Sequence, residues 1–208
     1  MKKRLLVGAI LLIGLGGLAA VKLSTPKPLV LETSFEFPIG KAVAPFSLVN
    51  QDNQEFTNSN LQGKWSLFFV GYTSCPDVCP TTMAKLSALY PSLAELGPIQ
   101  IVFLSVDPQR DTPEKLKSYV QYFNPNFVAV TGSHAQLQPI VRSLGMVYAM
   151  VGDGDDYQVD HSTSLILVSP LGEKVAVVKP TAEPGNLPQI RNQSLLADVT
   201  KIISKNSF

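Results

Sequence analysis

The sequence of 208 residues has little of the chemistry that soft metals and redox reactions need, because it contains two cysteines and two histidines. Two cysteines are too few for a scaffold held by several disulfides, or for a zinc or iron–sulfur site built from four cysteines. An excess of charge is also absent, since 17 Lys and Arg face 16 Asp and Glu. Nucleic-acid binding, which needs a basic face, is therefore not expected. The 45% of hydrophobic residues excludes a disordered chain and can fill the core of one domain.

The N-terminus has the pattern of a membrane segment. Three cations at positions 2–4 precede an apolar run at residues 5–21, which ends at Lys22. As a helix at roughly 1.5 Å per residue, the run would be about 26 Å long, just enough to cross a thin bilayer. We therefore predict a membrane anchor at residues 1–22, with the rest of the chain exported to an oxidising compartment. A cleaved signal peptide is the alternative, because residues 17–19 have a small-x-small pattern.

The remainder of the chain divides into a predicted tether and one predicted domain. Residues 23–43 contain three prolines without a sustained period, which predicts an extended tether, and residues 44–208 have the composition of a compact domain. The expected strands are 65–72, 99–106, 127–130, 147–151, 165–168 and 174–178, and the expected helices are 80–96, 113–123, 133–144 and 187–204. Helical crossovers between parallel strands indicate a three-layer α/β sandwich.

Both cysteines lie in one segment, GYTSCPDVCP at residues 71–80, where a predicted strand ends and a helix begins. This carboxyl edge of the sheet is where α/β folds place ligands, and a helix N-terminus should lower the pKa of thiols there. Cys75 and Cys79 at helical spacing would have Cβ atoms about 5–6 Å apart. A disulfide prefers roughly 3.5–4.5 Å, whereas a metal between two sulfurs tolerates the longer distance. The spacing favours a dithiolate metal site that can also oxidise over a static disulfide.

The histidines differ in their positions. His161 lies just before the predicted strand 165–168, in a loop expected at the same sheet edge as the cysteines. Two thiolates and an imidazole suit Cu(I), and a labile fourth position would admit Cu(II), whereas structural zinc normally takes four protein ligands. A lone loop histidine is nevertheless more often solvated than a ligand. Asp160 is a candidate acceptor that would orient the imidazole. We interpret His134, at a predicted helix start, as a surface or capping residue.

The segment at residues 107–113 (DPQRDTP) follows another predicted strand and therefore belongs to the same edge. Thr112 and Pro113 have the pattern of an N-cap and a first helical residue. Loop and cap chemistry is the expected role of the segment, and docking of a partner or tuning of the site is the alternative. The sequence resembles neither a Ser-His-Asp hydrolase nor a phosphate-binding loop.

Three segments resemble the signature blocks of the Sco/SenC proteins. They are GYTSCPDVCP at 71–80, SVDPQRDTPEKL at 105–116 and DYQVDHSTSLILVSPLG at 156–172. The resemblance implies a thioredoxin-like fold behind an N-terminal membrane anchor. It also implies a copper site, for Cu(I) or Cu(II), whose ligands are Cys75, Cys79 and His161. Two departures stand out: Ser169 replaces the usual acidic residue of a late turn, and a histidine segment stands where thioredoxins have a proline, which favours metal handling over general disulfide exchange.

The function that the resemblance implies is copper delivery. A single-pass helix would hold the chain at the inner (cytoplasmic) membrane, with the domain in the periplasm. The expected client is the CuA centre of cytochrome c oxidase subunit II, and another periplasmic copper chaperone or a thiol reductase would be a further partner. The alternative is a thiol-disulfide oxidoreductase that reduces the CuA cysteines, with Cys75 as the attacking thiol and Cys79 as the other member of the redox-active pair. A redox sensor or a peroxide-handling protein is a weaker third reading.

Overall fold

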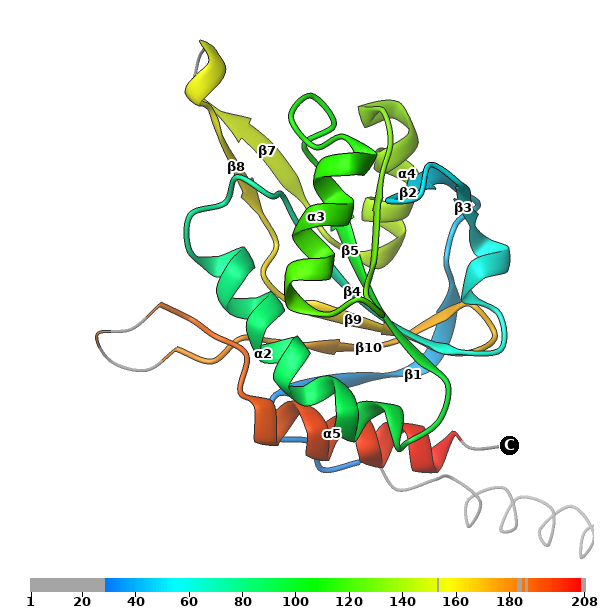
Figure 1. The fold of residues 1–208 in the computed structure, drawn as a ribbon. Coiled ribbons are helices and arrows are strands. Elements are labelled where there is room, and N and C mark those ends of the chain that lie inside the picture. The colour runs from blue at the N-terminus through cyan, green and yellow to red at the C-terminus, as the bar shows by residue number, and fades with distance from the viewer. Residues whose placement is uncertain (1–28, 153, 183–184, 186, 207–208) are drawn as a thin grey trace, which may run out of the picture. The chain divides into compact units, whose positions relative to one another are not determined.

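The computed structural model describes residues 29–152, 154–182, 185 and 187–206 (Figure 1). The predicted anchor at residues 1–22 lies outside the described residues. Among those that are described, no helix is both long and apolar enough to span a membrane. The compact unit that contains both cysteines extends from Leu31 to the C-terminus.

Within the described residues, eight strands form one mixed sheet in the order β1-β10-β9-β4-β5-β6-β2-β3. The strands are β1 (Ser34–Ala42), β2 (Ser47–Asn50), β3 (Glu55–Thr57), β4 (Trp65–Gly71), β5 (Ile99–Ser105), β6 (Val128–Thr131), β9 (Leu165–Val168) and β10 (Glu173–Val178). Strands β4, β5 and β6 are parallel. Every residue of β4 and β5 is buried, as expected for apolar strands covered on both faces. The predicted hairpin of β9 and β10 is confirmed.

Helices cover both faces of this sheet. They are α2 (Val78–Ala94), α3 (Pro113–Phe123), α4 (His134–Leu144) and α5 (Asn192–Lys205), with short 3-10 helices at η1 (Asn58–Leu61) and η2 (Gly154–Asp156). Figure 1 shows α2, α3 and α5 on one face of the sheet. On this face the ring of Tyr119 in α3 packs against the ring of Phe103 in β5, with the centroids 5.2 Å apart. Helix α4 buries Leu144 in the core on the other face, together with Phe68 of β4. The predicted three-layer architecture and the Thr112 cap of α3 are confirmed.

The tether prediction is wrong for the residues that form β1. This strand pairs antiparallel with β10 at the edge of the sheet. Its start is held by the buried carboxylate of Asp198 in α5, which accepts hydrogen bonds from the backbone N–H groups of Glu32, Thr33 and Ser34 at 2.8 to 2.9 Å. Proline signalled a tether, but Pro38 lies between the two paired parts of β1, where the register shifts. Edge strands tolerate proline at such irregularities, so the folded unit begins before the predicted boundary at residue 44.

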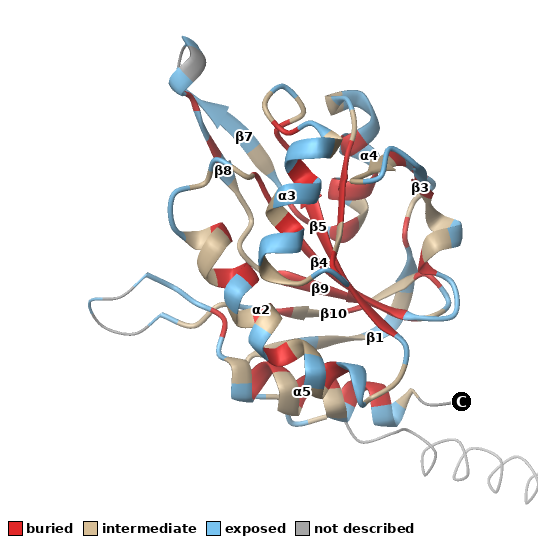
Figure 2. Cartoon of the chain, in the orientation of Figure 1, coloured by how far each residue is buried: buried red, intermediate tan, exposed pale blue. Residues whose placement is uncertain are grey.

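A second correction concerns the predicted strand at 147–151. It forms as β7 (Tyr148–Val151), but it pairs with β8 (Gln158–His161) in a separate two-stranded sheet and not in the central one. His161, predicted in a loop, is the last residue of β8 and lies opposite Tyr148. Figure 2 shows that this β7–β8 hairpin is largely exposed, whereas β4 and β5 are buried. The hairpin stands outside the three layers.

Candidate metal centre

The cysteine pair lies where β4 ends and α2 begins, at the predicted edge of the sheet. Cys75 is half-buried, Cys79 is buried, and both are free thiols. The backbone N–H of Cys79 donates to Sγ of Cys75 at 3.5 Å, which folds the loop back on the helix start. Gly71 makes room for the pair, because a Cβ at this position would lie 2.8 Å from both Sγ of Cys79 and a ring carbon of Phe103. A residue without a side chain is therefore required at the end of β4.

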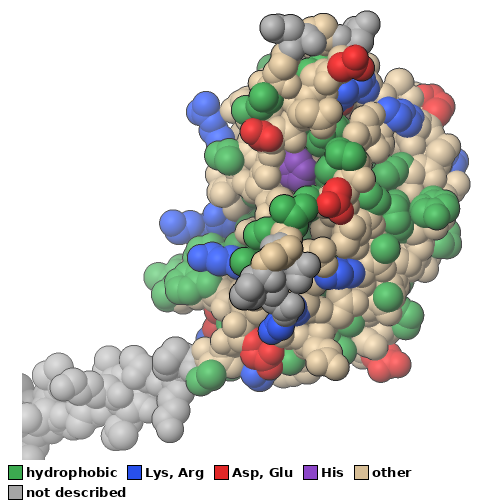
Figure 3. Space-filling view, turned by 90° about the vertical axis from the view of Figure 1, so that its left-hand side faces the viewer, with side chains coloured by type: hydrophobic (Ala, Val, Ile, Leu, Met, Phe, Trp, Pro, Cys, Tyr) green, Lys and Arg blue, Asp and Glu red, His purple; other side chains and the backbone are tan. Residues whose placement is uncertain are grey.

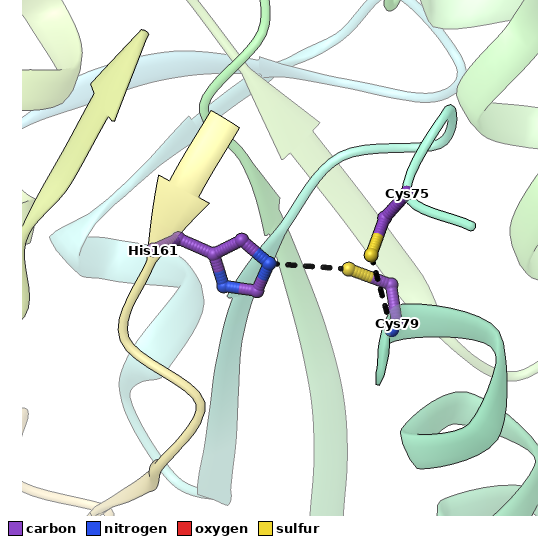
Figure 4. Close-up of side chains that lie close together, drawn as sticks. All are labelled: Cys75, Cys79 and His161. Atoms are coloured by element: carbon purple, nitrogen blue, oxygen red, sulfur yellow. Dashed lines mark hydrogen bonds between the residues drawn. The ribbon is translucent and has the colours of Figure 1, made fainter. Parts of the chain in front are cut away.

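His161 reaches the pair from the end of β8. Its Nε2 lies 3.4 Å from Sγ of Cys79 (Figure 4). Nδ1 lies 3.1 Å from the carbonyl oxygen of Ser162, to which it donates. A proton held on Nδ1 leaves the lone pair of Nε2 free for a metal. The proposal of Asp160 as the orienting acceptor is wrong, since the neighbouring main-chain carbonyl takes this role and Asp160 is exposed.

The structure thus brings the three predicted residues together. The ligand atoms of Cys75, Cys79 and His161 all lie within 4.8 Å of one another. An ion at about 2.3 Å from sulfur and 2.0–2.1 Å from nitrogen would hold its ligand atoms roughly 3.5–4 Å apart. The rings of Phe69 and Tyr72 meet the imidazole edge-on, at centroid distances of 6.1 and 6.0 Å, and limit its rotation. Two sulfurs and one nitrogen form a soft donor set that can hold a thiophilic metal ion.

The two thiols have opposite protonation tendencies. The hydrogen bond from Cys79, against the opposing effect of burial and with a smaller contribution from His161, lowers the pKa of Cys75 to about 3. The same hydrogen bond, together with burial, raises the pKa of Cys79. The helix start predicted lowered pKa values for both thiols, and this is wrong for Cys79. At neutral pH the half-buried Cys75 is therefore the thiolate and the buried Cys79 is its hydrogen-bond donor.

The loop after β5 contributes two buried carboxylates beside the cluster. Asp111 accepts hydrogen bonds from the backbone N–H of Thr73 and the hydroxyl of Ser105, at 2.9 and 2.6 Å. Asp107 accepts a hydrogen bond from the hydroxyl of Tyr157, which precedes β8. The sequence placed these residues at the right edge but gave cap chemistry as their main role. These carboxylates contact residues far away along the chain, Thr73 for Asp111 and Tyr157 for Asp107, and the sequence alone does not indicate such contacts.

The remaining sequence candidates lie elsewhere. His134 begins α4 and is partly exposed, with Nδ1 at 2.9 Å from the hydroxyl of Tyr148, so its interpretation as a surface residue is confirmed. Ser169 is buried in the turn between β9 and β10, where its hydroxyl accepts from the N–H groups of Leu171 and Glu173. This departure from the Sco/SenC pattern is a turn cap and not part of the cluster.

An open depression leads from the surface to the cluster. It has a volume of about 310 Å³, and its lining includes Cys75, Asp77, Val159 and His161. Figure 3 shows that a histidine is visible at the surface among hydrophobic and acidic side chains. Because Cys79 is buried behind the other two ligands, a partner approaching through this depression would meet Cys75 and His161 first.

Fold and cluster together define a class: a thioredoxin-like α/β protein with two thiols and an imidazole gathered at the carboxyl edge of its sheet. The SCO1/SenC family model matches residues 38–193, and the chain belongs to this family. A SCO2-like protein of Rickettsia prowazekii (strain Madrid E) is 40% identical over 169 residues, which are 78% of this chain and 82% of that protein.

Solved structures show the same relationship. The chain is similar to Arabidopsis thaliana ScoI with copper bound, at 34% identity and a TM-score of 0.68, over 79% of this chain and 99% of that one. It is also similar to BsSco, a member of the Sco family of cytochrome c oxidase assembly proteins in which a disulfide switch is identified. That match has 27% identity and a TM-score of 0.60, over 83% of this chain and 99% of the other.

Proposed function

We propose that the protein is a copper metallochaperone that binds copper through Cys75, Cys79 and His161. The observation that carries the proposal is the gathering of these three soft ligand atoms within 4.8 Å. Thiolates favour Cu(I), and an imidazole beside them extends binding to Cu(II). A solved structure that is 34% identical, Arabidopsis thaliana ScoI, holds copper, which supports this choice of metal.

The proposed client is the CuA centre of cytochrome c oxidase subunit II. The relationship to BsSco, from a family of cytochrome c oxidase assembly proteins, supports this client. Copper would leave by ligand exchange, in which thiolates of the acceptor replace one donor ligand at a time. The open depression exposes Cys75 and His161 ahead of the buried Cys79. The exchange would therefore begin at the two outer ligands and end at Cys79.

The proposed location is the inner (cytoplasmic) membrane, with the domain in the periplasm. The basic and apolar pattern of residues 1–22 supports this location. An anchor would keep the domain at high local concentration beside a membrane-bound client. Membrane fractionation and the mass of the mature chain test the anchor, and a soluble chain without its first 20 or so residues would reject it.

The test of copper binding is a titration of the reduced domain by chelator competition. His161→Ala should lose Cu(II) binding, by more than the roughly 10–100-fold that loss of a supporting contact costs, and should weaken Cu(I) binding less. Tyr90→Phe is the control, because this tyrosine packs against Phe127 and lies outside the cluster. A wild-type domain that takes up no stoichiometric copper would reject the chaperone proposal.

A second candidate function is thiol-disulfide exchange, and the unequal pair of thiols favours it. Cys75 is a half-buried thiolate whose pKa is lowered to about 3, so it is the attacking sulfur. It would attack a disulfide of the client, break its S–S bond, release one client sulfur as a thiolate and form a mixed disulfide with the other. Cys79 would then lose its proton, attack Cys75 and release the second client thiol. Two electrons pass to the client, and the pair becomes a disulfide.

The reduction of an oxidised CuA domain separates the two functions. A reductase should keep most of its activity in His161→Ala, because the imidazole takes no part in the electron balance and lowers the pKa of Cys75 less than Cys79 does. A chaperone would lose copper delivery in His161→Ala while keeping any thiol exchange. Wild type that reduces the domain without binding copper would establish the reductase and reject the chaperone.

A further inference from the structure

The cluster is assembled from two elements that share no strand pairing. The cysteines belong to the junction of β4 and α2, whereas His161 belongs to the β7–β8 hairpin, 82 residues after Cys79. The segment at residues 107–111, which follows β5, contributes no ligand atom to the cluster. It nevertheless contacts both halves.

On the cysteine side, the contact runs through Asp111, which is 1% exposed. Its carboxylate accepts from the backbone N–H of Thr73 at 2.9 Å and from the Thr73 hydroxyl. Lys115 lies 3.5 Å from the same carboxylate and donates to the hydroxyl of Ser74 at 3.2 Å. These bonds fix both residues that immediately precede Cys75.

On the histidine side, the contact runs through Asp107, which is 0% exposed. Its carboxylate accepts from the hydroxyl of Tyr157 and forms an ion pair with Arg110. The guanidinium of Arg110 lies 3.7 Å from the centroid of the Tyr157 ring and donates to the Tyr157 carbonyl at 2.9 Å. Tyr157 is thereby held by its ring, its hydroxyl and its main chain, four residues before His161.

A third set of contacts closes the arrangement directly. Tyr72 begins the cysteine loop, and its hydroxyl donates to the side-chain carbonyl of Gln158, the first residue of β8, at 2.8 Å. Arg110 also covers the Tyr72 ring, at 5.5 Å from its centroid. The guanidinium therefore lies against one aromatic ring from each half of the cluster.

We infer that the segment at residues 107–111 is a positioning element of the copper site, which aligns the histidine half with the cysteine half. The inference rests on the proposed function for the identity of the metal. Two thiolates alone can hold Cu(I), whereas Cu(II) depends on the added imidazole. Loosening the segment therefore reduces Cu(II) affinity much more than Cu(I) affinity.

Tyr157→Phe is the sharpest variant, because it removes one hydroxyl and keeps the ring under Arg110. Groups bonded directly to a metal ligand are worth about 10–100-fold in metal affinity, and Tyr157 acts one step further away, so we expect a loss of at most about that size for Cu(II) and a much smaller change for Cu(I). The Cu(II) absorption and EPR spectra should change as the imidazole ligand is lost from part of the population. Tyr90→Phe is the matched control, since this half-buried tyrosine packs against Phe127 at a ring distance of 5.5 Å, outside the network.

A double-mutant cycle with His161→Ala separates positioning from general support of the fold. If Tyr157 acts through His161, its substitution has no further effect on the affinity for Cu(I), which His161→Ala still binds, once the imidazole is gone. An equal loss in both backgrounds, or equal losses for Cu(I) and Cu(II), would overturn the inference.

The metal-free protein gives a readout that does not depend on copper. The ¹⁵N shifts of the His161 imidazole should report one ring environment in the wild type and in Tyr90→Phe, and a mixture in Tyr157→Phe. Unchanged His161 shifts in Tyr157→Phe would contradict the inference. A wild type that binds no copper would reject the proposed function, while these shifts still decide whether the segment positions His161.

Discussion

The two halves of the candidate copper site are anchored in different ways. The segment that carries the cysteines follows β4, whose seven residues are all buried and which is paired with β5 and β9. His161 ends a two-stranded hairpin that pairs with no other strand in the described part of the chain, and in which Val151 is 47% exposed. Core packing fixes the thiols, whereas the histidine half buries, among its described residues, only Tyr157 and Val159 in the core and depends otherwise on a small set of polar and aromatic contacts.

This difference separates the two chemistries of the site. Thiol exchange needs only the half that the core holds, since Cys75 lies in the loop after β4 and Cys79 in the first turn of α2. Cu(II) binding also needs the half that the hairpin carries. A change in the hairpin should therefore alter the metal chemistry strongly and the thiol chemistry only through the weaker effect of His161 on the pKa of Cys75.

The largest predicted effect concerns local opening of the two halves. Amides of β4 should exchange with solvent only on global unfolding, which costs about 5–15 kcal/mol in a typical domain. Amides of β7 and β8 should exchange at least about 10³-fold faster, because a two-stranded hairpin opens locally. Hydrogen exchange of the metal-free domain, followed by NMR, measures both. Equal protection of the amides of β4 and β8 would contradict the claim that the hairpin opens independently of the core.

The next effect is on the reactivity of Cys75. With its pKa lowered to about 3 by Cys79, this thiol is ionised at every pH above that value, so its alkylation rate should be flat between pH 5 and 8. Cys79→Ala removes the hydrogen-bond donor, and the pKa should move toward its ordinary value of about 8.5. The rate should then rise about a thousandfold over the same pH range, because the thiolate fraction rises tenfold per pH unit.

Iodoacetamide labelling followed by mass spectrometry measures these rates. His161→Ala is the companion variant, since loss of the weaker histidine contact should raise the pKa of Cys75 less than loss of Cys79 does. A flat profile in Cys79→Ala would show that the helix start, and not the second thiol, ionises Cys75.

The smallest effect tests the packing beneath the cysteines. Gly71→Ala places a Cβ at 2.8 Å from Sγ of Cys79, and overpacking of this kind costs about 1–3 kcal/mol. We expect a loss of that size in the free energy of unfolding, measured in urea, with weaker Cu(I) binding. Gly132→Ala is the control, because its Cβ would meet the movable end of Leu48 at 2.9 Å, away from the cluster. Unchanged Cu(I) affinity in Gly71→Ala would contradict the requirement for glycine.

The central fold could be predicted because its signals are local. β4 and β5 are continuous apolar runs, and Thr112 with Pro113 marks the start of α3. β2 and β3 were not predicted, because each strand has a single buried residue, Leu48 in β2 and Phe56 in β3. A single buried residue produces no alternation of apolar and polar positions along the sequence. The edge strand β1 was not predicted, because its proline indicated a tether.

The site could be predicted in its residues but not in its supports. The spacing of Cys75 and Cys79 indicated a metal, and the resemblance to Sco/SenC proteins added His161. The acceptor for the imidazole is a main-chain carbonyl, which every residue has, so no residue type could signal it. The contact of Asp107 with Tyr157 joins residues 50 apart, a pairing that only the folded chain determines.

The separation of 82 positions between Cys79 and His161 also determines when the site can form. During synthesis the two thiols emerge early, and a chain at that stage offers a metal two sulfurs and no imidazole. Closing a loop of this length costs about 4 kcal/mol of chain entropy. A metal that needs all three ligands binds only after that closure and stabilises the closed state by mass action. Cu(II) would thus bind only to folded molecules, whereas Cu(I) on the cysteine pair would bind to folded and incompletely folded molecules alike.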